Sequence, residues 1–254
     1  MELFSLHNQV AVVIGGSKGL GKGIASGLAL AGATVVLASR NQAELELAAA
    51  EIRNATHADV IGVSVDITSI AAIQEFVSTV LTLKGRIDIL VNSAGINIRK
   101  KAVEFTENDW DTVMDTQLKY VFFMNQVVGK AMIAEKVKGK IINVASLTSV
   151  LGLKGMVAYG SAKAAIVQMT KALANEWAEY GIRVNAIGPG YYQTEMTQPL
   201  FTDEKAVASM LENIPLKRLG LPEDLSGTAI LLASDASAYI TGQVFYVDGG
   251  WLIE

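Results

Sequence analysis

The chain has 254 residues, of which 51% are hydrophobic and 18% are charged, with a formal net charge of −4, so we expect one α/β domain over residues 1–254. The absence of cysteine excludes disulfides, thiolate metal sites and cysteine nucleophiles, and the absence of a basic block argues against a nucleic-acid partner. Apolar runs too short to cross a membrane, and an N-terminus without a secretory signal, predict a cytoplasmic protein.

Short β-rich runs alternate with longer helical patterns along the chain. The runs are almost continuously apolar, as in strands covered by helices on both faces, which predicts a doubly wound parallel sheet of about seven strands. The predicted strands are Val10–Ile14, Thr34–Ala38, Val60–Val65, Ile89–Asn92, Lys140–Ala145, Arg183–Ile187 and Gln243–Val247. The predicted helices include Leu20–Ala31, Ala43–Asn54, Ile70–Leu83, Trp110–Glu135 and Tyr159–Tyr180.

One stretch, about 188–213, breaks this rhythm between the sixth and seventh predicted strands. It holds two of the four prolines and then a short helical pattern. Long excursions at the edge of a sheet often carry function, so we expect this one to form a substrate lid.

A glycine-rich turn, Gly15-Gly-Ser-Lys-Gly19-Leu-Gly21, joins the first strand to the first helix. Glycines permit the tight turn and let backbone N–H groups at the helix start approach a pyrophosphate. The spacing is G-x-x-x-G-x-G, and a glycine turn after a strand is also found in a purely structural role. Its place after the first strand of a parallel sheet favours a nucleotide site.

The end of the second strand indicates which dinucleotide would bind. A site for NAD carries Asp or Glu there, whereas this chain has Ser39-Arg40, and Lys18 would face the same ribose. Two cations and no carboxylate suit a 2′-phosphate, so NADP(H) is favoured unless both are ordinary surface charges. Asp66, after the third strand, is placed to accept from an adenine amino group or to cap a helix.

Tyr159 and Lys163 lie four residues apart in a segment that otherwise reads as apolar helix, so both side chains face one direction. A free tyrosine titrates near pH ~10, and a neighbouring positive charge lowers that pKa and makes the phenol a usable acid or base. The same spacing also occurs on solvated helix faces.

With Ser146, which precedes Tyr159 by 13 residues, these motifs resemble the short-chain dehydrogenase/reductase family over essentially the whole chain. The resemblance implies a Rossmann-type fold and a homotetramer in which the helical segments 110–135 and 159–180 pair across a two-fold axis. The landmarks, in the family's order, are Gly15–Gly21, Asp66, Asn92–Gly95, Ser146, Tyr159 with Lys163, Pro189-Gly190 with Thr194, and Asp248–Gly250.

The resemblance also implies roles for these residues. Tyr159 would be the general acid or base on the substrate oxygen, Ser146 would hydrogen-bond that oxygen, and Lys163 would lower the tyrosine pKa and hold the nicotinamide ribose. The reaction would be hydride transfer between the nicotinamide and a carbinol or carbonyl carbon. The expected cofactor-binding residues are Gly15, Ser17, Lys18, Gly19, Leu20, Gly21, Ser39, Arg40, Asn41, Asp66, Ile67, Asn92, Ala94, Gly95, Tyr159, Lys163, Pro189, Gly190, Tyr192 and Thr194.

The chain departs from the family pattern at several positions. Ile14 replaces a threonine before the glycine turn, and Ser93 replaces a second asparagine. Gln117 stands where most members carry an asparagine that binds a water leading from the lysine to solvent. The longer glutamine either reproduces that contact or displaces the water, and we treat Gln117 as a fourth catalytic candidate.

Within the family the chain looks most like sugar-acid members of the gluconate 5-dehydrogenase and 2-deoxygluconate 3-dehydrogenase types. Arg99 matches an arginine that such members often carry, and its guanidinium would bind a substrate carboxylate bidentately. A solvated loop charge is the alternative, since Lys100 and Lys101 follow. Ser39-Arg40 favours the NADP-linked gluconate 5-dehydrogenase type. The resembling segments are Gly95–Arg99, Glu104–Trp110, Ile187–Tyr191, Thr194–Thr197 and Asp248–Leu252.

Two other functions stay open. A 3-oxoacyl-carrier-protein reductase or other carbonyl reductase would share the chemistry, although a carrier protein needs a basic docking patch and the chain offers little beyond Arg99–Lys101. A catalytically inactive dinucleotide-binding sensor is favoured only by Gln117. No metal is expected, because His7 and His57 lie outside every motif.

Overall fold

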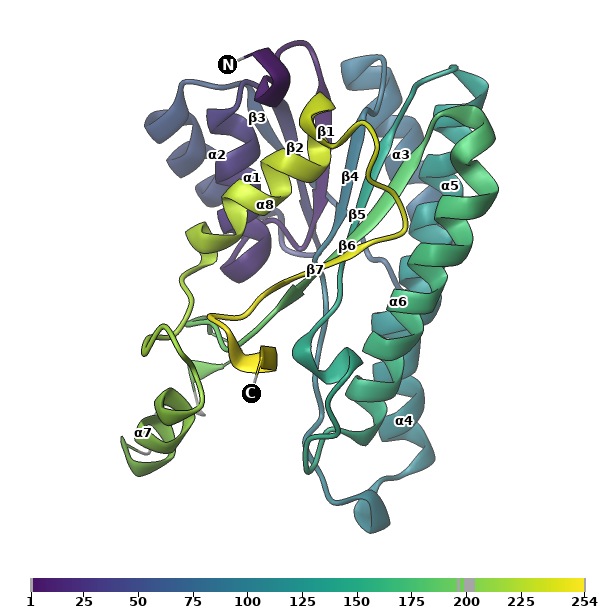
Figure 1. Cartoon of the computed structure of the whole chain (residues 1–254). Coiled ribbons are helices and arrows are strands. Elements are labelled where there is room, and N and C mark those ends of the chain that lie inside the picture. Colours follow the sequence, from purple (N-terminus) through teal and green to yellow (C-terminus); the bar gives the residue numbers. More distant parts are fainter. Residues whose placement is uncertain (1, 196, 199–203, 254) are drawn as a thin grey trace.

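The computed structural model describes residues 2–195, 197–198 and 204–253 and shows one parallel sheet in the order β3-β2-β1-β4-β5-β6-β7 (Figure 1). The order reverses between β1 and β4, which confirms the doubly wound arrangement. All six strand pairs are parallel. The strands are β1 (Val10–Ile14), β2 (Thr34–Ser39), β3 (Val60–Ser64), β4 (Ile89–Asn92), β5 (Lys140–Val144), β6 (Arg183–Pro189) and β7 (Val244–Val247).

Helices cover both faces of the sheet, because successive side chains of each strand point in opposite directions. Ala11 and Val13 of β1 belong to the core under α1, α2 and α8, whereas Val12 and Ile14 belong to the core under α3, α5 and α6. Figure 1 shows these two groups of helices on either side of the strands. The helices are α1 (Gly19–Leu30), α2 (Gln42–Thr56), α3 (Ile70–Lys84), α4 (Glu107–Met114), α5 (Tyr120–Ala134), α6 (Val157–Trp177), α7 (Glu204–Glu212) and α8 (Ser226–Ala233).

Two helical features differ from the prediction. The segment predicted as one helix over 110–135 begins at Glu107 and is divided by a π-helical turn, Asp115–Lys119, between α4 and α5. The residues that follow the turn, YVFFMNQVVGKAMIA, are almost all apolar, so they show no polar face whose rotation would reveal it. Helix α8 was missed because its sequence, SGTAILLA, has no polar face that would mark a helical period.

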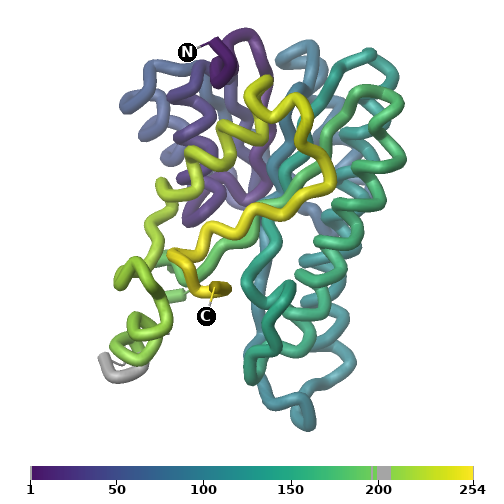
Figure 2. Tube along the Cα trace, in the orientation of Figure 1, coloured from purple at the N-terminus to yellow at the C-terminus, as the bar shows by residue number. Residues whose placement is uncertain are grey.

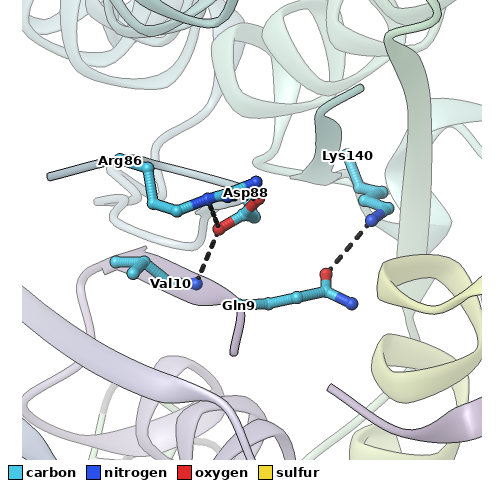
Figure 3. A network of polar contacts seen from close by, with 5 residues as sticks. All are labelled: Gln9, Val10, Arg86, Asp88 and Lys140. Carbon is cyan, nitrogen blue, oxygen red and sulfur yellow. Dashed lines mark hydrogen bonds and ion pairs between the residues drawn. The ribbon is translucent and has the colours of Figure 1, made fainter. Parts of the chain in front are cut away.

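A polar network fastens the amino end of the sheet, opposite the strand ends that carry the glycine turn (Figure 3). Asp88 is 3% exposed, accepts a 2.9 Å hydrogen bond from the Val10 amide and accepts further hydrogen bonds from the Arg86 guanidinium. Lys140 of β5 donates to Gln9 Oε1 at 3.1 Å, and burial lowers the pKa of Lys140. These contacts join β1, β4 and β5 at one edge.

The predicted lid lies beyond the carboxyl end of the sheet. Of 188–213, Met196 and residues 199–203 lie outside the described residues, and α7 occupies the final part. Figure 2 shows α7 and α4 on opposite sides of that end of the molecule. Among the described residues, no helix has the length and apolarity that a membrane crossing requires.

Candidate active site

Ser146, Tyr159 and Lys163 come together at the carboxyl end of β5. Ser146 follows the strand, and its Oγ accepts a 3.2 Å hydrogen bond from the Thr148 amide as a short 3-10 turn begins. Tyr159 and Lys163 stand one turn apart on α6. The Ser146 hydroxyl lies near enough to the Tyr159 phenol to lower its pKa, so strand and helix bring these polar groups together.

The lysine of this group is buried, with only 5% of its surface exposed. Lys163 Nζ donates to the Val144 carbonyl oxygen at 2.7 Å and lies 5.6 Å from the centre of the Tyr159 ring. Burial lowers the pKa of Lys163 to about 7. The ammonium therefore gains or loses its proton near neutral pH, where an ordinary lysine stays charged.

Opposing influences act on the phenol of Tyr159. Burial raises its pKa, while the hydrogen bond from Ser146 and the positive charge of Arg99 lower it. The phenol is thus protonated at neutral pH and is held where neighbours stabilise its anion, as a general acid requires.

Gln117 fills the space beside the end of β4. It is 1% exposed in the π-helical turn, a feature often found at functional sites, and its Nε2 donates to the Ile96 carbonyl oxygen. Its Oε1 is buried without a hydrogen-bond partner among the described residues. A Cβ on Gly95 would lie 2.6 Å from Gln117 Nε2, so the longer amide is accommodated only by the glycine.

The glycine turn forms a cradle between β1 and α1. Gly15 has a φ of +77°, and a Cβ on it would lie 2.7 Å from the Ala94 amide nitrogen, so only glycine fits. Helix α1 has no side-chain cap at Lys18, which leaves its first N–H groups for an anion. A Cβ on Gly19 would lie 3.6 Å from Thr194 Cγ2. The glycine turn thus lies close both to the residues after β4 and to the base of the lid.

The end of β2 carries the groups expected near an adenosine ribose. Ser39 Oγ is buried with no hydrogen-bond partner among the described residues, and Arg40 is exposed. Asn41 caps α2 by accepting from the Ala43 and Glu44 amides, at 3.1 and 3.3 Å. Its side-chain oxygen therefore already has a structural task.

Lys18 has a partner that the sequence did not indicate. Its Nζ lies 2.8 Å from Glu195 Oε2, and this hydrogen bond, reinforced by the carboxylate charge, raises the pKa of Lys18. Glu195 belongs to the lid segment and lies 177 positions away in the chain, so no local motif relates the two.

Asp66 does not cap α3, because the N-cap of that helix is Ser69. Of its two predicted roles, only the contact with an adenine amino group stays open. Its Oδ1 accepts from the Thr68 amide at 3.0 Å and from Thr68 Oγ1 at 2.7 Å, and these hydrogen bonds lower the pKa of Asp66. The carboxylate is exposed. Nearby, Ile67 and Ala94 line a small pocket together with Ile14, Asn92, Tyr120, Val121 and Met124.

A buried amide network lies behind this pocket, and no sequence motif predicts it. Asn92 Nδ2 donates to Asn125 Oδ1 at 2.6 Å and to Asn143 Oδ1 at 2.9 Å. Asn143 Nδ2 donates in turn to Thr170 Oγ1 at 3.1 Å. The network joins β4, α5, β5 and α6, and it occupies the Asn92 side chain that was expected to contact the cofactor.

Residues at the base of the lid are fixed by the last strand and by one another. The Tyr192 hydroxyl donates to the Val247 carbonyl oxygen at 2.9 Å, and burial raises the pKa of this tyrosine. Only the backbone of Tyr192 is left for a ligand. Thr194 pairs with Thr197 through their hydroxyls at 3.0 Å, and Pro189 with Gly190 continues β6 towards this turn.

Arg99 differs from the two lysines that follow it. Lys100 lies 2.6 Å from Asp109 Oδ2 and Lys101 lies 3.8 Å from Glu104 Oε1, whereas Arg99 has no acidic partner among the described residues. Arg99 is exposed, and its charge lowers the pKa of Tyr159, so the guanidinium acts on the reacting group across solvent-accessible space.

Comparison with known proteins agrees with this geometry. The family model described as Enoyl-(Acyl carrier protein) reductase matches residues 15–252. The 2-dehydro-3-deoxy-D-gluconate 5-dehydrogenase of Escherichia coli is 43% identical, covering 99% of this chain and 98% of its own. Gluconate 5-dehydrogenase of Gluconobacter oxydans is 39% identical, with coverage of 98% and 96%. A crystal structure of a gluconate 5-dehydrogenase from Burkholderia cenocepacia, in complex with NADP and tartrate, has a TM-score of 0.95 and 34% identity, with coverage of 100% and 98%.

Proposed function

The chain belongs to the short-chain dehydrogenase/reductase family, and from this premise we propose that it is an NADP-dependent oxidoreductase acting on a sugar acid. The reaction would interconvert a secondary alcohol and a ketone, as between gluconate and 5-ketogluconate. The observation that carries the proposal is the meeting of Ser146, Tyr159 and Lys163 beside an arginine without an acidic partner among the described residues.

The cofactor, when bound, would supply the hydride chemistry: NADPH gives a hydride to the ketone, and NADP+ accepts one from the alcohol. The glycine turn and the start of α1 would hold its diphosphate, while Lys163 would hold the nicotinamide ribose. Ser39 Oγ, which lacks a partner among the described residues, and the cations of Arg40 and Lys18 would bind the 2′-phosphate. In support, the relative from Burkholderia cenocepacia was crystallised with NADP.

Four side chains of this protein would handle the proton. Ser146 and Tyr159 donate hydrogen bonds to the carbonyl oxygen and polarise it, and Tyr159 gives that oxygen its proton as the alkoxide forms. Lys163, with its pKa near 7, then stabilises the phenolate and passes a proton towards it. Gln117 would join this relay through its Oε1, which has no hydrogen-bond partner in the part of the chain that the structure describes.

Arg99 would select an acid among possible ketones. A guanidinium binds carboxylate through two parallel N–H···O bonds, and Arg99 lies within electrostatic reach of the Tyr159 phenol. The sugar-acid names of the relatives from Escherichia coli and Gluconobacter oxydans support this substrate class.

The test is to follow NADPH and NADH absorbance with 5-ketogluconate, L-sorbose, acetoacetyl thioesters and simple ketones, using Tyr159→Phe as the control. We expect turnover of 5-ketogluconate with NADPH, abolished in the control. Absence of turnover on every substrate despite tight NADPH binding would mean a dinucleotide sensor. Preference for the thioesters would mean a carrier-protein reductase.

The remaining parts of the proposal concern assembly and setting. We propose a homotetramer in the cytoplasm, with residues 188–213 closing over the substrate. Support for the assembly comes from the exposed apolar side chains of Trp110 on α4 and Val157 on α6, which are 39% and 43% exposed. Light scattering of the purified protein tests the oligomeric state.

A further inference from the structure

Buried polar atoms without a partner gather around the catalytic residues. Within the described part of the chain, the buried side-chain atoms that form no hydrogen bond are Ser39 Oγ, Asn97 Oδ1, Gln117 Oε1 and Thr148 Oγ1. Such an atom lowers stability unless something binds it, so each one calls for an explanation. Ser39 and Gln117 have proposed tasks at the 2′-phosphate and in the proton relay, whereas Asn97 and Thr148 have none.

Thr148 adjoins both catalytic segments. It is 6% exposed and lies two residues after Ser146, whose Oγ accepts a 3.2 Å hydrogen bond from the Thr148 amide. A Cβ on Gly160 would lie 3.4 Å from the Thr148 carbonyl oxygen and 3.7 Å from its Cβ, so the threonine packs against the residue that follows Tyr159. Its unpartnered hydroxyl is therefore held between the turn of Ser146 and the helix of Tyr159.

Asn97 lies on the segment that follows β4, next to Ile96, whose carbonyl oxygen accepts from Gln117 Nε2. The Asn97 Nδ2 donates to Met156 Sδ at 3.2 Å, and Met156 is the N-cap of α6, three residues before Tyr159. A thioether sulfur is a weak acceptor. Neither end of the Asn97 amide thus binds a strong partner among the described residues.

Both residues contact the same turn of α6. Asn97 binds Met156, whose carbonyl oxygen accepts from the Gly160 amide at 2.7 Å, and Thr148 packs on Gly160. Tyr159 belongs to this turn. The two side chains with unused hydrogen-bonding capacity are therefore placed against the helical turn that carries the reacting phenol.

We propose that Asn97 and Thr148 form a subsite that binds hydroxyl groups of the substrate next to its reacting carbonyl. The inference rests on the proposed function, because it requires a polyhydroxylated substrate at Ser146 and Tyr159. An amide oxygen accepts a hydrogen bond and a threonine hydroxyl donates or accepts one, which suits hydroxyl groups. The amide torsion of asparagine is broad, so Asn97 can turn from the Met156 sulfur to a hydroxyl. An acyl chain or simple ketone offers no such group, and the subsite would favour a sugar acid over both.

The variants Asn97→Leu and Thr148→Val test this, because each removes the polar atoms and keeps a side chain of similar shape. Each should raise KM for 5-ketogluconate about 10-fold, while kcat and the KM for NADPH stay within about twofold. Neither should lower the melting temperature, because no strong hydrogen bond of these side chains is lost within the described residues. Thr56→Val at the end of α2 is the matched control. Its hydroxyl donates to the Ile52 carbonyl oxygen at 2.7 Å, so the melting temperature should fall and the KM should stay unchanged.

The competitor 5-oxohexanoate separates recognition of the hydroxyl groups from recognition of the rest of the substrate. It keeps the carboxylate and the ketone of 5-ketogluconate at the same positions and lacks the hydroxyl groups. Its inhibition constant against 5-ketogluconate should therefore agree within about twofold between the unmodified protein and both variants.

The outcomes separate this inference from the proposed function. An unchanged KM for 5-ketogluconate in either variant would overturn the role of that residue and leave the proposed function standing. Equal weakening of 5-ketogluconate and 5-oxohexanoate would also overturn the subsite, because the loss would then concern groups that the two molecules share. No turnover of 5-ketogluconate by the unmodified protein would overturn both.

Discussion

Lys163 Nζ donates its hydrogen bond to the carbonyl oxygen of Val144, the last residue of β5, and so ties the catalytic helix to the strand that precedes Ser146. The contact orients the ammonium but does not neutralise it, because a carbonyl carries no formal charge. The burial that lowers the pKa of Lys163 therefore has a cost in stability as well as a use in proton transfer.

The sign of that cost sets a pH dependence. Lys163 titrates at about 7 in the folded protein and near 10.5 when unfolded, so between these values the unfolded chain binds more protons. The free energy of unfolding should then rise with pH across this window, by a total on the order of a few kcal/mol. Lys163→Met should flatten the rise and lower activity ~10²-fold or more. Urea unfolding at several pH values measures the free energy of unfolding of both proteins. An equally steep rise with pH in Lys163→Met would contradict the role given to Lys163.

Ser146→Ala should move the pH profile of alcohol oxidation. The serine hydrogen bond lowers the pKa of Tyr159, so its removal raises that pKa, and the phenolate that accepts the substrate proton forms only at higher pH. The ascending limb of kcat/KM against pH should shift upward, with kcat/KM at pH 7 lower by ~10²-fold or more. An unshifted limb would show that the hydrogen bond has no influence on the tyrosine.

Gly95 and Gln117 should behave as a coupled pair. Gly95→Ala places a methyl group 2.6 Å from the glutamine amide and should destabilise the protein by about 1–3 kcal/mol. Gln117→Asn withdraws the amide by one methylene, so the double variant should lose less than the sum of the two single changes. The free energies of unfolding in urea of the unmodified protein, the two single variants and the double variant give this double-mutant cycle. Additive losses would mean that the two side chains do not compete for space.

Glu195→Gln should favour NADPH over NADH. In the structure the Glu195 carboxylate pairs with Lys18, and a 2′-phosphate would have to compete for the same ammonium. Both partners are exposed, so the gain is small, about two- to fivefold in the KM for NADPH at low salt. The KM for NADH should stay unchanged. An equal improvement for both cofactors would argue against a role of Lys18 at the 2′-phosphate.

Asp88→Ala should damage stability and spare the chemistry. It leaves the Val10 amide and the Arg86 guanidinium without their acceptor at the amino end of the sheet, at a cost of about 2–4 kcal/mol. The melting temperature should fall while the KM values for NADPH and substrate remain unchanged at 25 °C. A change in either KM would show that this edge communicates with the active site.

The sheet was predictable because a strand that is buried on both faces has a continuous run of apolar residues in its sequence. The continuous apolar run Val10–Ile14 is strand β1 with the predicted bounds, and Ile89–Asn92 is β4 with the predicted bounds. Helix α8 and the π turn before α5 could not be predicted in this way, because the apolar sequences of α8 and α5 have no clear polar face that would show a helical period or a break in it.

The four-residue spacing placed Tyr159 and Lys163 on one face of a helix, and the family resemblance implied that Ser146 lies beside them. Asn125, Asn143 and Glu195 were not foreseen. Their partners come from distant segments, and the residue type alone does not predict which distant group an asparagine or a glutamate will bind.

The buried amide network has a consequence for how accurately α6 is placed. Apolar side chains tolerate small displacements, whereas the bonds from Thr170 through Asn143 to Asn92 and Asn125 close only at one axial position of the helix. A slip of one residue would leave these buried polar groups unpaired, at about 1–3 kcal/mol each. Tyr159 and Lys163 lie on the same helix, so their position above the sheet depends on the hydrogen bond that the Thr170 hydroxyl, two turns beyond Lys163, accepts from Asn143.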